Sequence, residues 1–292
     1  MATLRDIRNR ISSVKSTEKI TKAMKMVAVA KLRRAQDAIS QARPYAKKMQ
    51  EILSHLAAKV NVYDFLLLND RPIENIAVVV VTSDRGLCGA FNTNLIRYAV
   101  QYLKSNYNAQ LAAGKVKLIC VGKKGTEYFS KRSYNVVSKY VGLYQYLKFS
   151  TAREIADKLI EGYTDGSFDK IEIIYNEAKG LATQKIVIDQ FLPITSTKKE
   201  SNSMTDYIYE PSSTELITSL VPKHLHFQIW KILLESNAAE QGAKMIAMDN
   251  ASTNARDLIR LLQLYYNKAR QASITKELLE IVAGAEALKK AS

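Results

Sequence analysis

The 292-residue sequence has few of the residues on which several protein classes depend. It contains two cysteines, Cys88 and Cys120, a number that excludes a disulfide framework and gives no zinc-ligand spacing. Both lie in or beside apolar strand-like runs, so we interpret them as small core residues in a reducing compartment. The three histidines, His55, His224 and His226, do not recur at the i, i+4 spacing of a helical metal pair. We therefore expect no metal site.

Long apolar runs are also missing. No stretch approaches the roughly 18 apolar residues that a membrane span requires. The first residues, MATLRDIRNRISSVKS, lack the apolar core of a signal peptide, and we expect no signal or transit peptide. The sequence predicts a soluble protein that is still able to sit beside a membrane.

Glycine is absent from residues 4–59, where the only proline is Pro44. This segment reads as helix with the alternating three- and four-residue spacing of a coiled coil. We expect Pro44 to bend or divide the helix near Gln41. A first seam is expected to join a second one after a phase slip near Glu18. The first is Leu4, Ile7, Ile11 and Val14; the second is Met24, Ala28, Lys31, Ala35, Ala38, Ala42, Tyr45, Met49, Ile52 and Leu56.

Residues 60–211 alternate strand-like and helix-like segments. Runs such as IENIAVVVVTS and KVKLICVG predict strands, and NTNLIRYAVQYLKSNY and TAREIADKLIEGY predict helices. The alternation indicates an α/β domain with a mostly parallel (Rossmann-like) sheet. The last two strands, KIEIIYNEA and QKIVIDQFLPI, are expected to be antiparallel, and TSTKKESNSMTD is expected to be a mobile loop.

Residues 212–292 again read as helix, with an uninterrupted part expected only after Pro222. The sequence thus predicts three parts: an N-terminal coiled-coil helix at 1–59, the α/β domain at 60–211 and a C-terminal coiled-coil helix at 212–292. The seam of the last helix is Ala238, Gln241, Met245, Met248, Ser252, Ala255, Ile259, Leu262, Tyr266 and Ala269.

The two helices are too long for a compact domain, at roughly 84 and 115 Å with 1.5 Å per residue. We expect them to form a long antiparallel coiled coil. Equal rise from a shared base places Met24 opposite Lys244 to Met248 and leaves the second helix unpaired from about Lys268. The unpaired part carries an apolar stripe that needs a partner from another chain. This stripe consists of Ile274, Leu278, Ile281 and Val282.

Positive charge is concentrated in the first helix. Residues 1–60 hold 14 basic and 4 acidic side chains, most of the net charge of +15. This excess indicates an acidic surface opposite the helix.

The stretch SDRGLCGAFN, which follows a strand, does not match a nucleotide-binding motif. It lacks the third glycine of the dinucleotide fingerprint and the lysine of the P-loop. We interpret it as a tight turn in which Gly86 and Gly89 permit positive φ, with Asn92 or Thr93 near the helix cap. Since no G-x-S-x-G elbow exists either, the sequence indicates no catalytic residue and no cofactor site.

Three stretches closely resemble the gamma subunits of F-type rotary ATP synthases. They are STEKITKAMKMVAVAKLRRAQ, SDRGLCGAFN and DNASTNARDLIRLLQLYYNKARQASITKELLEIVAGAEAL. The resemblance covers essentially the whole chain and keeps the family's order of long helix, α/β domain and long helix.

This resemblance implies a central rotor shaft that couples ion-driven rotation of a membrane c-ring to ATP synthesis or hydrolysis at beta subunits. The implied partners are an alpha3-beta3 hexamer, an epsilon-type subunit and the c-ring, with no direct small-molecule substrate. The implied location is peripheral, on the cytoplasmic face of a bacterial cell membrane. The resemblance implies contacts with the beta lever loops from Met24, Lys25, Lys244, Arg270 and Gln271. An apolar collar of the hexamer is expected to hold the stripe from Ile274 to Val282 as an upper bearing.

Some points stay open at the level of sequence. Lys25 stands where some relatives carry an acidic residue, so its role is unassigned, and the coupling ion is either a proton or sodium. The alternative is a basic coiled-coil protein that binds nucleic acid. Against it, residues 1–60 hold a single aromatic residue, Tyr45, and no recognition motif follows the helix.

Overall fold

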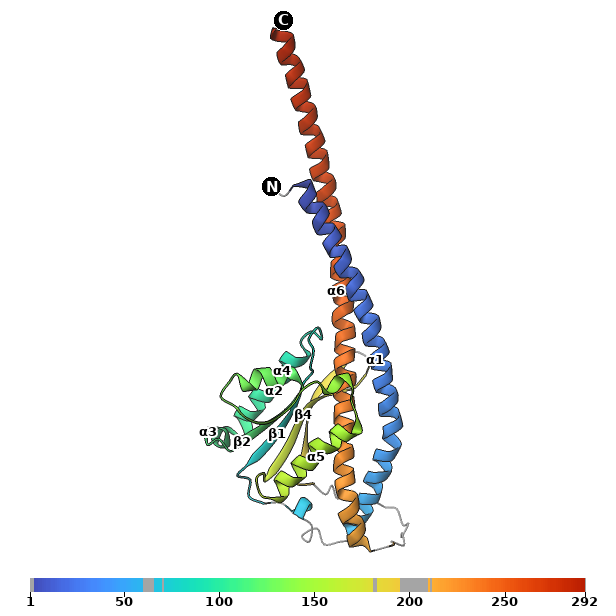
Figure 1. Cartoon of the computed structure of the whole chain (residues 1–292), viewed down its shortest axis with the longest axis vertical. Helices are drawn as coiled ribbons and strands as arrows, with labels where there is room; N and C mark the ends of the chain where they lie inside the picture. Colours follow the sequence, from blue (N-terminus) through green and yellow to red (C-terminus); the bar gives the residue numbers. More distant parts are fainter. Residues whose placement is uncertain are drawn as a thin grey trace. The chain divides into compact units, whose positions relative to one another are not determined.

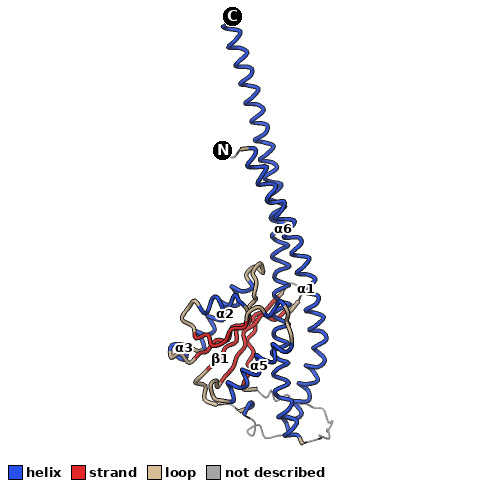
Figure 2. Tube along the Cα trace, viewed as in Figure 1, coloured by secondary structure: helices blue, strands red, loops and turns tan. Residues whose placement is uncertain are grey.

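The computed structural model describes residues 3–59, 66–69, 71–180, 183–194, 210 and 212–291. Its longest elements are the helices α1 (Leu4–Lys59) and α6 (Ser213–Ala291), shown in Figures 1 and 2. The other elements, in chain order, are η2 (Leu66–Leu68), β1 (Ile76–Val81), α2 (Phe91–Asn106), α3 (Asn108–Ala112), β2 (Val116–Val121), α4 (Lys123–Ser130), β3 (Asn135–Tyr140), η3 (Leu143–Gln145), α5 (Phe149–Thr164), β4 (Lys170–Ala178) and β5 (Gln184–Leu192).

The contacts within the chain define two compact units. Unit 1 joins residues 1–27 to 245–292, and unit 2 consists of residues 28–244. Each of the long helices contributes to both units. The expected loop TSTKKESNSMTD lies outside the described residues.

Unit 2 is built on a five-stranded sheet with the order β3-β2-β1-β4-β5. The first four strands are parallel, and β5 pairs antiparallel with β4. The predicted α/β class, the mostly parallel sheet and the antiparallel last pair are thus confirmed.

Helices cover both faces of this sheet. Val78, Leu118 and Ile174 point to one face, where they pack with Leu95 and Leu103 of α2. The opposite face is covered by α5 and by the first part of α6 (Figure 1). Because β1 is covered on both sides, all six of its residues are buried, which explains why its sequence is continuously apolar.

Within unit 2, α6 begins one residue from its predicted start at 212, but Pro222 does not interrupt it. It starts at Ser213 and continues through Pro222, so the expectation of an uninterrupted helix only after Pro222 is wrong. A proline inside a helix removes one backbone donor. Here Val221 and Leu225, on either side of it, are buried in the core shared with α5 and the sheet, and this packing offsets the loss.

Two predictions about α1 also require correction: the break at Pro44 and the phase slip near Glu18. The helix runs unbroken from Leu4 to Lys59 through Pro44, so it is not divided near Gln41. Lys31 is exposed, and Leu32 and Ile39 are buried instead. The three-four spacing therefore continues without a slip. The positions that follow it are Leu4, Ile7, Ile11, Val14, Glu18, Thr21, Lys25, Ala28, Leu32, Ala35 and Ile39.

In unit 1, α1 and α6 pack as an antiparallel coiled coil joined by polar pairs. The hydroxyl groups of Thr21 and Ser252 lie 2.7 Å apart and are buried. The Lys25 ammonium donates to Asp249 at 2.6 Å. These pairs place Met24 opposite the turn that holds Asp249, a few residues beyond the predicted Lys244 to Met248. The predicted register assumed that α1 ends and α6 begins at the same level, and the observed pairs show an offset of a few residues.

The unpaired end of α6 begins later than predicted. The Thr21–Ser252 and Glu18–Arg256 pairs place the start of α1 opposite Ala269 or Arg270, so the paired segment does not stop before Lys268. From Ile274 to Ala285 every side chain is exposed, including Leu279 at 64% and Ile281 at 68%. An exposed apolar stripe on a single helix indicates a surface that a partner covers.

The register gives a direct cross-linking prediction. In a Thr21→Cys/Ser252→Cys variant, mild oxidation is expected to join the two helices, because the hydroxyl oxygens they replace are 2.7 Å apart. Non-reducing electrophoresis after proteolysis between the helices measures the bond. A matched pair, Thr21→Cys with Arg270→Cys, is the control and should not cross-link. Equal yields from both pairs would contradict this register.

Candidate functional site

The carboxyl edge of the sheet is where open α/β domains bind ligands, at the point where the strand order reverses. In this chain that point lies between β1 and β4. Ala239 of α6 forms a buried cluster there with Cys88 and Phe91, and Ala178 at the end of β4 packs against it. The position that a nucleotide takes in other α/β domains is thus occupied by the chain's own helix.

The turn after β1 differs in part from its prediction. Gly89 has φ of 58°, as expected, but the second left-handed residue is Leu87, with φ of 67°. The prediction of positive φ is wrong for Gly86. Asn92 does not cap its own helix but holds the end of β1, since it accepts from the Ser83 amide at 3.0 Å and donates to the Ser83 hydroxyl at 2.8 Å.

A carboxylate, rather than an anion-binding group, lies at the centre of this edge. Asp84 accepts hydrogen bonds from the amides of Lys123 at 3.0 Å and Gly142 at 2.8 Å. The Lys123 amide is the first of helix α4, so Asp84 takes the place at which a phosphate would bind a helix N-terminus. Asp84 therefore already uses the amide donors that a phosphate would need at this edge.

Helix α6 carries a buried ion pair beside this turn. The Lys244 ammonium lies 2.8 Å from a Glu240 carboxylate oxygen, and the two side chains are only 14% and 5% exposed. Burial raises the pKa of the Glu240 carboxyl, and Lys244 opposes this shift. The Lys244 charge is therefore paired within the chain and is mostly buried.

The two described histidine side chains have separate environments on α6. Burial lowers the pKa of His224, and His226 lies 2.5 Å from a carboxylate oxygen of Asp157 on α5. Within the described part of the chain, no group of three or more His, Cys, Asp or Glu side chains is placed to hold a metal ion.

Within unit 1, the residues predicted to contact beta subunits lie at two separate places on the helices. Met24 is half-buried and Lys25 pairs with Asp249. Arg270 and Gln271 are exposed on the far part of α6, whereas Lys244 belongs to unit 2 and is mostly buried. The four predicted bearing residues, Ile274, Leu278, Ile281 and Val282, are 49–68% exposed.

Sequence reasoning missed a second apolar surface on unit 1. Ile20, Met26 and Val27 of α1 are 59%, 61% and 56% exposed. The sequence held a signal for this surface. These three apolar residues lie outside the three-four seam, in a helix whose other outward residues are mostly charged. With Lys19 and Lys22 next to them, these side chains make a mixed apolar and basic surface whose apolar area a partner can bury.

The isolated chain is expected not to bind ATP, because α6 occupies the crevice and Asp84 already uses the amides that a phosphate would need. Calorimetric titration of the full-length chain with magnesium-ATP should give no saturable heat. Gly86→Val serves as the control, since a Cβ at this position meets nothing within 4 Å and the fold should tolerate it. Micromolar binding that Gly86→Val abolishes would contradict this reading.

Comparisons with known proteins agree over the full length. The ATP synthase family matches residues 3–288. The ATP synthase gamma chains of Chloroherpeton thalassium and Chlorobaculum tepidum are 51% and 52% identical, covering 100% and 99% of this chain and 100% of each relative.

Solved structures with a similar fold are parts of mitochondrial ATP synthases. A chain of the Euglena gracilis OSCP/F1/c-ring structure is 26% identical with a TM-score of 0.66, over 98% of this chain and 94% of that one. A chain of the Tetrahymena thermophila central stalk/c-ring structure is 25% identical with a TM-score of 0.62, over 80% and 99%.

These comparisons do not support the nucleic-acid-binding alternative. Among the described helices, none is long and apolar enough to cross a membrane. The family match, the identity over the whole length and the long-helix architecture lead to one assignment: the chain belongs to the gamma-chain family of ATP synthases.

Proposed function

We propose that the chain is the central rotor shaft of an F-type ATP synthase. It couples ion-driven rotation of a membrane c-ring to ATP synthesis or hydrolysis at the beta subunits of a surrounding alpha3-beta3 hexamer. The observation that carries this proposal is the antiparallel coiled coil of unit 1, from which α6 continues as a single helix with exposed apolar side chains. A slender, asymmetric rod of this kind can contact three identical beta subunits differently, as coupling by differential contact requires.

The outer surface of α1 is the proposed contact with the hexamer. Its basic charge favours acidic loops, and the exposed Ile20 and Val27 add apolar area that a partner can bury. We assign the contacts with beta lever loops to Met24, Lys25, Arg270 and Gln271. Lys244 is the least suited of the predicted residues, because its side chain is only 14% exposed and its ammonium is paired with the buried Glu240.

The upper bearing is proposed at the single-helix end of α6. Ile274, Leu278, Ile281 and Val282 recur at helical spacing and are all exposed. A lone helix with such a stripe is marginal in water, and an apolar collar formed by the hexamer would stabilise it.

The shaft itself is proposed to be non-catalytic, without cofactor or metal. The support is the absence of a nucleotide motif in the sequence and the occupation of the sheet edge by Ala239 and Asp84. ATP chemistry is then left to the beta subunits. An epsilon-type subunit and the c-ring are the proposed partners of the α/β domain, which places the chain peripherally at the cytoplasmic face of a bacterial cell membrane.

Purification from gently solubilised membranes tests this function. A tagged chain is expected to bring down equal amounts of alpha and beta subunits together with ATPase activity. An Ile281→Asp/Val282→Asp variant should reduce the recovered hexamer, and Lys276→Gln, an equally exposed position nearby, is the control. Recovery of the chain without any ATPase subunit would refute the proposal.

A further inference from the structure

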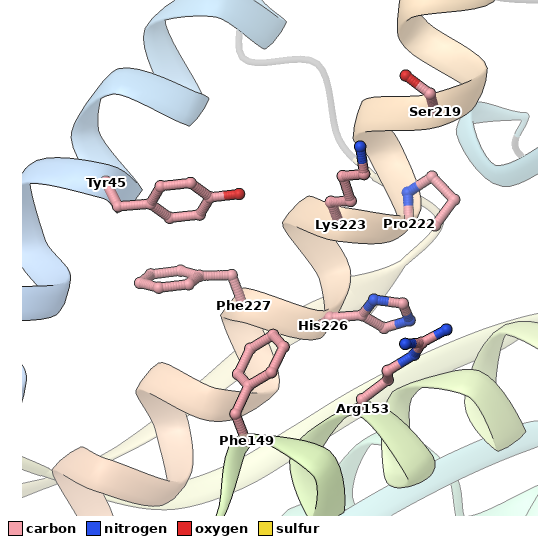
Figure 3. Close-up of a pocket in the computed structure, with 8 residues that line it drawn as sticks. All are labelled: Tyr45, Phe149, Arg153, Ser219, Pro222, Lys223, His226 and Phe227. Carbon is pink, nitrogen blue, oxygen red and sulfur yellow. The ribbon is translucent and has the colours of Figure 1, made fainter.

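Unit 2 contains a cavity that the shaft function does not use. It has a volume of about 540 Å³ and lies where α1, α5 and the first part of α6 meet (Figure 3). This volume is within the range of small-molecule sites. Its principal lining residues are Tyr45 of α1, Phe149 and Arg153 of α5, and Lys223, His226 and Phe227 of α6.

One part of the cavity wall is aromatic. The rings of Tyr45 and Phe227 face each other with centroids 4.8 Å apart. Tyr45 and Phe149 are nevertheless 47% and 46% exposed, so much of their apolar area remains in water. On its far side, the Phe149 ring meets Trp230 edge-on, with centroids 6.0 Å apart. An apolar chain laid against the exposed sides of Tyr45 and Phe149 would remove part of this area from water.

The other part of the wall is cationic. Figure 3 shows the side chains of Arg153 and His226 close together, with the Lys223 ammonium further along α6 and pointing away from them. Asp157 balances part of this charge, at 3.5 Å from Arg153 and 2.5 Å from His226. The described lining residues include no carboxylate. The cavity therefore presents more positive than negative charge to a ligand.

We propose that this cavity binds an amphiphilic anion, meaning an alkyl or aryl chain that carries one carboxylate, sulfonate or phosphate group. Arg153 binds the charged group, because its planar guanidinium suits a two-oxygen contact, and Lys223 adds positive charge to the same cavity. Tyr45, Phe149 and Phe227 hold the apolar chain. Because the three rings come from three helices, an occupied site ties α1, α5 and α6 together. The inference stands apart from the rotor proposal, since it rests only on unit 2.

Trp230, the only tryptophan in the chain, provides a reporter. Its fluorescence is recorded while the full-length chain is titrated with dodecanoate below the concentration at which this anion aggregates. A saturable change is expected, whereas acetate, which lacks the chain, should produce none. The alcohol 1-dodecanol, which lacks the charge, should bind at least about tenfold more weakly, since charge-assisted hydrogen bonds contribute on this scale.

Variants separate this site from non-specific uptake. Arg153→Met should weaken dodecanoate binding about tenfold or more and leave dodecanol binding unchanged. Lys158→Met removes the same charge from α5 next to Tyr140, and binding should be unchanged. Tyr45→Ala should weaken both ligands. Equal affinities of the Arg153 and Lys158 variants for dodecanoate would overturn the proposal, as would an unsaturable response.

The source of the anion is distinguished by a second titration. Vesicles of phosphatidylglycerol and phosphatidylcholine are compared with monomeric dodecanoate, with the Arg153→Met chain as the control. Binding of phosphatidylglycerol vesicles that depends on Arg153 identifies a membrane lipid, and binding of monomeric dodecanoate alone identifies a free fatty acid. If neither probe binds in an Arg153-dependent way, the cavity is not an anion site.

Discussion

Replacing Lys244 by methionine is expected to lower the free energy of unfolding by about 3 kcal/mol at pH 8. The substitution leaves the carboxylate of Glu240, whose side chain is 5% exposed, without the ammonium that lies 2.8 Å away. An unpaired buried charge costs more than the pair contributes, because desolvation is no longer offset. Chemical denaturation of the full-length chain, followed by circular dichroism, measures the loss.

The pH dependence of this loss identifies its cause. Burial already raises the pKa of Glu240 in the folded chain above its ordinary value. The folded state therefore binds a proton more strongly than the unfolded state, and stability falls as pH rises through the folded pKa. Lys244→Met raises that pKa further. Its destabilisation should shrink as pH falls, because a protonated, neutral Glu240 needs no ammonium partner.

The double variant Glu240→Met/Lys244→Met should recover most of the lost stability, since an apolar pair of similar volume needs no compensation. Lys276→Met, which breaks a fully surface-exposed pair with Glu280, is the control and should leave the melting temperature unchanged. If Lys244→Met left stability unchanged, as Lys276→Met should, the buried pair would not contribute to the stability of the fold.

Gly122→Ala is expected to destabilise the α/β domain by more than about 3 kcal/mol. Gly122 joins β2 to α4 with φ of 91° and ψ of 146°, a region that only glycine adopts freely. A Cβ there would lie 2.1 Å from the carbonyl oxygen of Thr82, at the end of neighbouring β1. The two strands cannot stay paired at this point without a backbone shift.

Gly142→Ala is the matched control for this substitution. Gly142 also has positive φ, at 84°, but a Cβ there meets nothing within 4 Å. It should cost about 1 kcal/mol of backbone strain and no clash. Thermal melts of the two variants separate conformational strain from steric overlap. Similar melting temperatures would mean that the close approach to Thr82 is unimportant.

The regular parts of the fold were predictable because their signals are local. The seam of α6 from Met248 through Ser252, Ala255 and Ile259 to Leu262 is buried as its spacing indicated. The sheet strands followed from apolar runs, since a parallel strand covered on both faces must be apolar throughout. The glycine turn was assigned correctly as a structural turn, although Leu87 rather than Gly86 takes the left-handed conformation.

The errors arose where contacts with residues distant in sequence outweigh the local sequence pattern. The apparent phase slip near Glu18 reflects polar seam residues, because Glu18 and Thr21 find Arg256 and Ser252 on α6. A search for apolar periodicity cannot recognise such positions. Pro222 did not end its helix because core packing holds both sides. The burial of Lys244 and the filling of the sheet edge by Ala239 depend on long-range packing, which no local motif encodes.

Rotation of the chain inside an immobilised hexamer tests the central claim most directly. The alpha3-beta3 hexamer is fixed to a surface, and a bead is attached to Lys104→Cys, an exposed position on α2. With ATP, we expect the bead to turn in one direction and to pause as each beta subunit takes its turn. Hydrolysis of ATP at the full rate while the chain stays still relative to the hexamer would contradict the account of this chain as a rotor shaft.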